Sequence, residues 1–126
     1  MNVLIGENMR LNLDEEYLSI EFEWYEQFWA IRFTNVMKIP IAHIQTATPL
    51  KPIASWRRIR YFGTVFGSFL AGTWFSKEGK EFWYVTEDRS YLTLELQLEP
   101  YCRVILTTPD HQIWCDRINQ QSRRVS

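Results

Sequence analysis

Residues 92–115, LTLELQLEPYCRVILTTPDHQIWC, contain in order an alternating strand, a short apolar strand and the start of a helix. From Leu92 to Leu98, leucines alternate with polar residues at a period of two, which is typical of a strand with one buried face. Arg103–Thr107 is a nearly continuous apolar run of strand length. Thr108-Pro109-Asp110 predicts a helix start, because a threonine cap, an early proline and an acidic first turn all favour one. The stretch predicts a β-rich domain that ends in a C-terminal helix.

The same kinds of pattern predict strands over most of the remaining chain. Leu18–Trp24 alternates apolar and polar residues, and the turns Asp14–Glu16 and Lys77–Gly79 predict hairpins. We expect further strands at Arg10–Leu13, Phe33–Ile39, Ile44–Pro49, Leu70–Phe75 and Lys80–Val85, a short helix over Tyr25–Arg32, and an irregular tract over Leu50–Arg60. On the C-terminal helix, Trp114 and Ile118 are expected to be buried against the sheet.

Length and composition predict one globular domain over residues 1–126. Hydrophobic residues make up 46% of the chain and charged residues 23%, which is a globular composition. The 20 aromatic residues suit a compact β-rich core or an aromatic-lined surface. Whether the aromatic face carrying Trp74 and Trp83 is core or interface stays open at this point.

The ends and the cysteines predict a cytoplasmic protein. Met1–Ile5 is too short and lacks the basic start of a secretory signal. Two cysteines are too few for a disulfide scaffold, although a single bridge between Cys102 and Cys115 is an alternative. Tyr61–Ser76 is uncharged, but it is shorter than the roughly 20 residues of a spanning helix and is interrupted by glycines. We expect a loop and a strand there, and no transmembrane segment.

Five short motifs stand out along the chain: Gly63-Thr64, Ala71–Phe75 (AGTWF), Gly79–Trp83 (GKEFW), Ile39–Ile44 (IPIAHI) and the helix start at Thr108–Asp110. Together these motifs resemble those of a group of uncharacterised bacterial proteins with a pleckstrin-homology-like fold. They cover roughly residues 17–121. In the family the glycine loop usually carries prolines, whereas here phenylalanines precede Gly63 and Gly67.

The resemblance implies a mainly β fold: a bent barrel of about seven strands, capped at one end by the C-terminal helix. It implies no particular ligand. A lipocalin-like barrel, which also ends in a helix, is the alternative fold. That alternative would enclose a cavity for an apolar ligand.

Charge is distributed unevenly along a chain whose net charge is only -1. Residues 1–26 hold seven acids and one base, whereas residues 27–77 hold seven bases and no acid. The densest basic part is Trp56-Arg57-Arg58-Ile59-Arg60-Tyr61. Arginine forks bind phosphate or carboxylate, and the flanking aromatic residues can stack or insert into a headgroup layer.

Three interpretations of this basic stretch compete. It is a solvated segment that pairs with the acids of the N-terminal part, or it recognises an anion, or it binds nucleic acid. The acids concerned in the first interpretation are Asp14, Glu15, Glu16, Glu21 and Glu23. The near-zero net charge argues against nucleic acid.

No motif predicts catalysis or a metal site. His111 and Cys115 have helical i, i+4 spacing, but zinc needs three or four ligands and no second pair is present. No family signature surrounds Cys102 or Cys115, and the sequence contains no phosphate-binding loop, nucleophile elbow or dinucleotide fingerprint. We therefore expect a packed thiol and histidine on the helix, no metal and no cofactor.

We expect a non-catalytic binding or interaction module. Its partner would be an anionic headgroup, with peripheral membrane contact, a phosphorylated ligand or an acidic protein. The expected ligand-binding residues are Trp56, Arg57, Arg58, Arg60 and Tyr61. The alternative is a small-molecule carrier or an enzyme with a lipocalin-like cavity, and the sequence leaves the oligomeric state open.

Overall fold

A computed structural model of the chain describes residues 9–22, 36–52, 59–66, 69–87 and 89–125. Within these ranges it contains nine strands, one short 3₁₀ helix and one α-helix. In chain order they are β1 (Arg10–Leu13), β2 (Tyr17–Glu21), β3 (Val36–Pro40), η1 (Ile41–His43), β4 (Ile44–Thr48), β5 (Ile59–Phe66), β6 (Phe69–Ser76), β7 (Gly79–Val85), β8 (Tyr91–Leu96), β9 (Arg103–Thr107) and α2 (His111–Val125).

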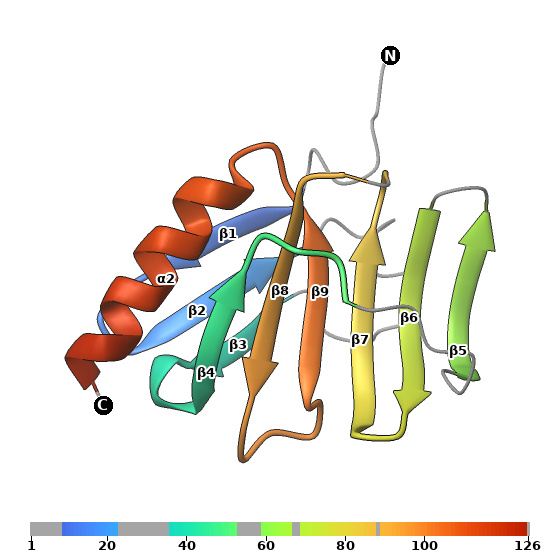
Figure 1. The fold of residues 1–126 in the computed structure, drawn as a ribbon, viewed down its shortest axis with the longest axis horizontal. Helices are drawn as coiled ribbons and strands as arrows, with labels where there is room; N and C mark the ends of the chain where they lie inside the picture. Colours follow the sequence, from blue (N-terminus) through green and yellow to red (C-terminus); the bar gives the residue numbers. More distant parts are fainter. Residues whose placement is uncertain (1–8, 23–35, 53–58, 67–68, 88, 126) are drawn as a thin grey trace.

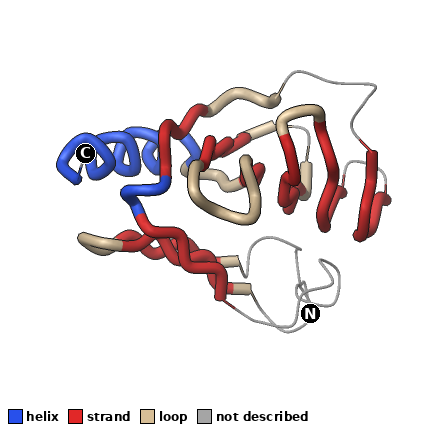
Figure 2. The backbone as a smooth tube through the Cα atoms, turned by 90° about the horizontal axis from the view of Figure 1, so that it is seen from below, coloured by secondary structure: helices blue, strands red, loops and turns tan. Residues whose placement is uncertain are grey.

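The strands form two sheets, which lie as separate layers linked through η1 (Figure 2). The first sheet has the order β1-β2-β3 and is antiparallel. The second has the order β4-β8-β9-β7-β6-β5 (Figure 1). All neighbouring strands of this sheet are antiparallel except β7 and β9. Strand β9 lies between β7 and β8, and it runs parallel to β7 and antiparallel to β8. Strand β5 therefore stands at one edge of this sheet and β4 at the other.

Alternation along the strands builds the main core between the two sheets and α2. On β7, Phe82 and Tyr84 are fully buried and belong to this core. The other members of this core come from the three-stranded sheet, the six-stranded sheet and α2. They include Leu18, Ile20, Ile39, Leu92, Leu94, Val104, Leu106, Cys115 and Ile118. Phe22 packs on the rings of Phe82 and Tyr84, with centroids 5.9 and 5.4 Å away. Among the described residues, side chains of both sheets and of α2 thus form one core between the sheets.

The C-terminal helix packs against β4, η1 and β8, along the side of the molecule where the two sheets are joined (Figure 1). Ile118 is fully buried as expected, whereas Trp114 is only partly buried, with the Arg117 guanidinium 4.8 Å from its ring centroid. The helix begins at His111, and the Trp114 N–H donates to the Asp110 carbonyl. Asp110 therefore occupies the cap position that the sequence predicted for Thr108.

The expected mainly β fold with a C-terminal helix is confirmed, but its finer description needs correction. The described strands form no closed barrel: no strand of the three-stranded sheet pairs with the six-stranded one. They also number nine rather than about seven, and β7 and β9 are parallel. The hairpin turns at Asp14–Glu16 and Lys77–Gly79 lie where the sequence predicted them.

Two local expectations also differ from the structure, and one falls outside the described residues. Ile59–Phe66 is a strand, although it was expected to be the end of an irregular tract and a glycine-rich loop; its β-branched and aromatic residues favour a sheet. Leu98 does not continue the buried face of β8: it is 83% exposed and has a φ of 62°. The short helix expected over Tyr25–Arg32 lies outside the described residues.

Candidate functional site

The basic stretch predicted as the binding site lies partly outside the described residues. Trp56, Arg57 and Arg58 fall in the segment 53–58, which the structure does not describe. Arg60 and Tyr61 lie near the start of β5, where Arg60 pairs with Trp74 of β6 and the register shifts before Phe62. Two of the five predicted residues are therefore placed on an edge strand of the six-stranded sheet.

Leu50 and Lys51, which precede the segment 53–58, lie on the outer face of the six-stranded sheet, the face turned away from the three-stranded sheet. The Thr93 hydroxyl donates a hydrogen bond of 2.9 Å to the Leu50 carbonyl. The Lys51 ammonium lies 5.8 Å from the centroid of the Tyr91 ring, within range of a cation–π contact. In Figure 1 the connection that leaves β4 passes in front of β8 and β9. The chain therefore enters the basic stretch from this face.

An aromatic cluster fills this outer face. Because successive side chains alternate along a strand, Trp83 and Val85 point away from the core that holds Phe82 and Tyr84. They pack with residues of β6, β8 and β9, namely Trp74, Tyr91 and Ile105. Trp74 and Trp83 are 8% and 5% exposed, with ring centroids 6.1 Å apart. The two tryptophans therefore belong to a buried cluster, which settles the question that the sequence left open.

A charged row crosses the same sheet at one level. Glu81 of β7 pairs with Arg103 of β9, which pairs in turn with Glu95 of β8. The Arg103 guanidinium donates to Glu95 over 2.6 Å, and it also donates to Glu81. The hydrogen bond with Glu95 is the main cause that raises the pKa of Arg103 above its usual range. Arg103 thus binds both carboxylates.

The row brings Glu81 next to the aromatic cluster. Its side chain is fully buried and also accepts a 2.9 Å hydrogen bond from the Trp83 indole N–H. Trp74, which pairs with Glu81, is in turn the β6 partner of Arg60. The sequence analysis did not single out Arg103 or its carboxylates, because they meet only through strand pairing over up to 22 positions of the chain.

The first interpretation of the basic stretch expects the N-terminal acids as its partners, and those that the structure describes lie in the β1–β2 hairpin of the three-stranded sheet. Asp14 accepts backbone hydrogen bonds from Tyr17 (2.7 Å) and Glu16 (2.8 Å), and these lower the pKa of its carboxyl. Glu21 lies 3.8 Å from Arg10. Glu23 is outside the described residues. The described acids of the β1–β2 hairpin therefore belong to a different sheet from Arg60 and from Tyr91, the contact of Lys51.

The cysteines and histidines show no catalytic arrangement in the part of the chain that is described. Burial raises the pKa of the Cys115 thiol to about 11 and also raises the pKa of Cys102, so both favour the unreactive thiol form. Both cysteines are free. Among the described residues, no group of three or more His, Cys, Asp or Glu side chains could hold a metal ion. Cys115 is buried in the main core, whereas His111 is half-buried at the start of α2.

One pair that the sequence analysis did not single out is His43 with Glu99. His43 Nδ1 contacts a carboxylate oxygen of Glu99, which joins η1 to the connection between β8 and β9. The two residues are 56 positions apart, so no local spacing could have indicated the pair. The backbone hydrogen bond from Gln97 to the His43 carbonyl, 2.9 Å long, fixes the same junction. The pair therefore connects η1 with the β8–β9 connection at one end of the sheets.

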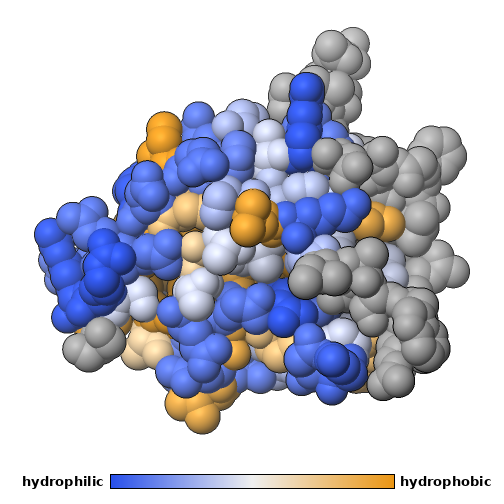
Figure 3. Space-filling view, in the orientation of Figure 1, coloured by the Kyte–Doolittle hydropathy of each residue, from blue (hydrophilic) through white to orange (hydrophobic). Residues whose placement is uncertain are grey.

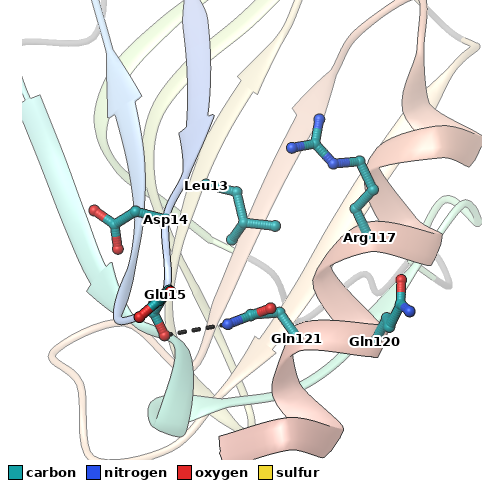
Figure 4. Close-up of a pocket in the computed structure, with 6 residues that line it drawn as sticks. All are labelled: Leu13, Asp14, Glu15, Arg117, Gln120 and Gln121. Atoms are coloured by element: carbon teal, nitrogen blue, oxygen red, sulfur yellow. Dashed lines mark hydrogen bonds between the residues drawn. The ribbon is translucent and has the colours of Figure 1, made fainter.

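The grooves lined by described residues are open and lie at the surface. One, of about 310 Å³, runs between the β1–β2 turn and α2, where Gln121 donates a 3.3 Å hydrogen bond to the Glu15 carbonyl (Figure 4). A second, of about 210 Å³, lies between β3 and the β8–β9 connection and includes Glu99. On the face seen in Figure 3, hydrophilic residues cover most of the helix side and apolar side chains show as small patches. The second groove is lined by side chains of both sheets, among them the core residues Ile39 and Val104.

No protein-family model, curated protein or solved structure matches this chain. In the part of the chain that the structure describes, no helix is both long and apolar enough to cross a membrane.

Proposed function

We propose that this protein is a non-catalytic binding module that recognises an anionic group through the basic segment, defined here as residues 51–61. The segment contains Lys51, Arg57, Arg58 and Arg60, flanked by Trp56 and Tyr61. A phosphate or carboxylate would be held by the arginine forks, while the aromatic residues stack beside it or anchor in a headgroup layer. The proposal includes a relationship of this chain to the pleckstrin-homology-like proteins that its motifs resemble.

The observation that carries the proposal is the position of the two ends of the basic segment. Lys51 lies on the outer face over Tyr91, and Arg60 lies on β5 at the edge of the same sheet. The acidic β1–β2 hairpin belongs to the other sheet. On the outer face, Glu81 and Glu95 are bound by Arg103. This arrangement favours an external anion over the N-terminal acids as the partner of the segment.

The filled core favours a module over a carrier with an internal cavity. Among the described residues, side chains of the two sheets pack against one another, and Leu18, Tyr84 and Leu94 are fully buried. A lipocalin-like carrier would need an interior space for its ligand, and ligand pockets typically measure about 300–1,000 Å³ and bury most of the ligand. Two grooves have comparable volumes: the one of about 310 Å³ between the β1–β2 turn and α2, and one of about 360 Å³ between the start of β4 and the end of α2. Both are open at the surface. Recognition at the surface is therefore the simpler function for this architecture.

The proposal is tested by binding of the whole chain to two defined anionic probes. The first probe is a vesicle of phosphatidylcholine with and without an anionic lipid, in a co-sedimentation assay. The second is a soluble phosphoserine peptide beside its unphosphorylated form, in a titration. We expect salt-sensitive binding to one of the two anionic probes and none to its neutral counterpart. Binding to neither, or equal binding to charged and neutral forms, would contradict the proposal.

A further inference from the structure

Three of the four sheet edges among the described strands carry features that block pairing with another chain. On β4, side chains of α2 occupy the edge: Asn119 bonds to both the N–H and the carbonyl of Ala47, and Ser122 donates to the Ile44 carbonyl. Strand β1 has only four residues and begins with Arg10; β3 carries Lys38 and ends at Pro40. Short strands, charges, prolines and covering groups are the usual means by which proteins protect sheet edges.

The fourth edge, that of β5, differs from the other three. The strand has eight residues, IRYFGTVF, with a single charge at Arg60 and no proline. Among the described strands it pairs only with β6. The register irregularity lies between Arg60 and Phe62, so Phe62–Phe66 is regular strand. A long, nearly uncharged edge of this kind is a template for a further strand.

Two hairpins determine which backbone groups of β5 point outward. Phe66 pairs with Phe69 across two residues, and such a closing pair exchanges backbone hydrogen bonds. Hydrogen bonding alternates along an antiparallel pair, so Thr64 and Phe62 also bond to β6. Gly63 and Val65 must then direct their N–H and carbonyl groups to the outer edge.

The β6–β7 hairpin leads independently to the same assignment. Ser76 pairs with Gly79 across two residues, so the even-numbered residues of β6 bond to β7. The odd-numbered residues of β6 are left to bond to β5, and Ala71 is the partner of Thr64. The backbone groups of Gly63 and Val65 are therefore the ones available to a new neighbour.

We propose that two copies of this chain associate through their β5 edges, as an antiparallel pair about a twofold axis at Thr64. In this register Gly63 of one copy lies opposite Val65 of the other, so their outward N–H and carbonyl groups form two equivalent hydrogen-bonded pairs. The two six-stranded sheets then become one continuous sheet. The register irregularity near Arg60 stays outside the paired region.

A second copy fits this edge better than another occupant, because the edge is complementary to itself. The twofold axis places the two Arg60 residues at opposite ends of the paired strands, so like charges do not meet. The blocked edges of β1, β3 and β4 exclude a head-to-tail chain in which β5 pairs with a different edge, so the association closes as a dimer. An extended peptide from another protein would lack this built-in symmetry. The inference does not depend on the anionic ligand.

The test compares the mass in solution of the wild-type chain with those of Val65→Pro and Val65→Ala. Proline removes the outward N–H at a position whose hydrogen bond is not needed within the sheet, whereas alanine keeps it. By light scattering over a concentration series, we expect wild type and V65A to approach twice the 15.2 kDa of one chain, and V65P to stay at that single mass. Circular dichroism checks that each variant is folded.

Amide hydrogen exchange of the wild-type chain gives a second measurement that needs no folded variant. The amides of Gly63 and Val65 should become more protected as the protein concentration rises, whereas the amide of Thr64, which already bonds to β6, should not change. A wild-type chain of single mass at all concentrations, or a folded V65P that still dimerises, would overturn the proposal. Protection at Gly63 and Val65 that stays constant over a concentration range in which the mass doubles would also overturn it.

Discussion

The side-chain amide of Asn119 forms two hydrogen bonds with the backbone of Ala47, one from the Ala47 N–H (2.9 Å) and one to its carbonyl (2.8 Å). This is the pattern that a neighbouring strand would provide. The helix α2 thus ends the six-stranded sheet at β4 with a side chain, 72 positions away in the sequence. Together with the Ser122 bond to Ile44, it holds the helix in register against the strand.

The first prediction concerns this amide. Asn119→Ala leaves two partly buried backbone groups without their partner, so the free energy of unfolding should fall by about 1–3 kcal/mol. Chemical denaturation followed by tryptophan fluorescence measures the change. Gln120, exposed on the same helix, supplies the control, and Gln120→Ala should change stability by less than about 0.5 kcal/mol. Equal stability of the two variants would contradict the role of Asn119.

The second prediction concerns the charged row. Arg103→Met leaves the fully buried Glu81 carboxylate without its guanidinium, and breaking a buried pair in this way costs about 3–5 kcal/mol. Glu95→Gln should cost clearly less, because the Glu95 side chain is 33% exposed and the amide oxygen still accepts from Arg103. Denaturation curves of the two variants provide the comparison. A larger loss in E95Q than in R103M would be inconsistent with the row as described.

The third prediction concerns acid pH. Backbone hydrogen bonds from Tyr17 and Glu16 lower the pKa of Asp14 below its unfolded value of 3.8. A lowered pKa contributes stability above the unfolded pKa, and this contribution is lost as the pH falls through the folded pKa. Asp14→Ala should therefore be less stable than wild type at neutral pH. The difference between their melting temperatures should shrink below about pH 4. A difference that stays constant across this range would show that the carboxylate charge plays no part.

The fourth prediction compares Leu94 and Leu98, which belong to the same stretch of alternating leucines in the sequence. Leu94 is fully buried in β8, whereas Leu98 is 83% exposed beyond the strand end. Leu94→Ala should cost about 2–5 kcal/mol, because it leaves a cavity in the core. Leu98→Ala should cost less than about 0.5 kcal/mol. Comparable losses at the two positions would mean that Leu98 is buried in solution.

The sequence predicted the strands and the helix well, because their signals are local. The alternation of Leu92–Leu96 and of Leu18–Phe22 reflects one buried face, and both segments lie in the main core. The alternation did not indicate where β8 ends, because Leu98 keeps the same spacing. Its φ of 62° and its exposure arise from the connection that leads on to β9.

The arrangement of the strands could not be predicted from the sequence in the same way. The parallel pairing of β7 with β9 depends on where β9 inserts, and no spacing in Arg103–Thr107 encodes it. The Glu81–Arg103–Glu95 row follows from that pairing. The candidate site was predicted from composition, as a run of bases between aromatic residues. The structure adds the face of the sheet on which Lys51 lies, ahead of the run, and the strand β5 on which the run ends.

The most direct test of the binding proposal measures anion binding and melting temperature on one variant, Arg57→Ala with Arg58→Ala. Arg123→Ala with Arg124→Ala, in the last turn of α2, removes the same charge elsewhere and is the matched control. The proposal predicts that the first variant loses salt-sensitive binding to the anionic probe and keeps its melting temperature, while the control still binds. A first variant that melts at a lower temperature and binds as wild type does would show that the arginines serve the fold, and would contradict the proposal.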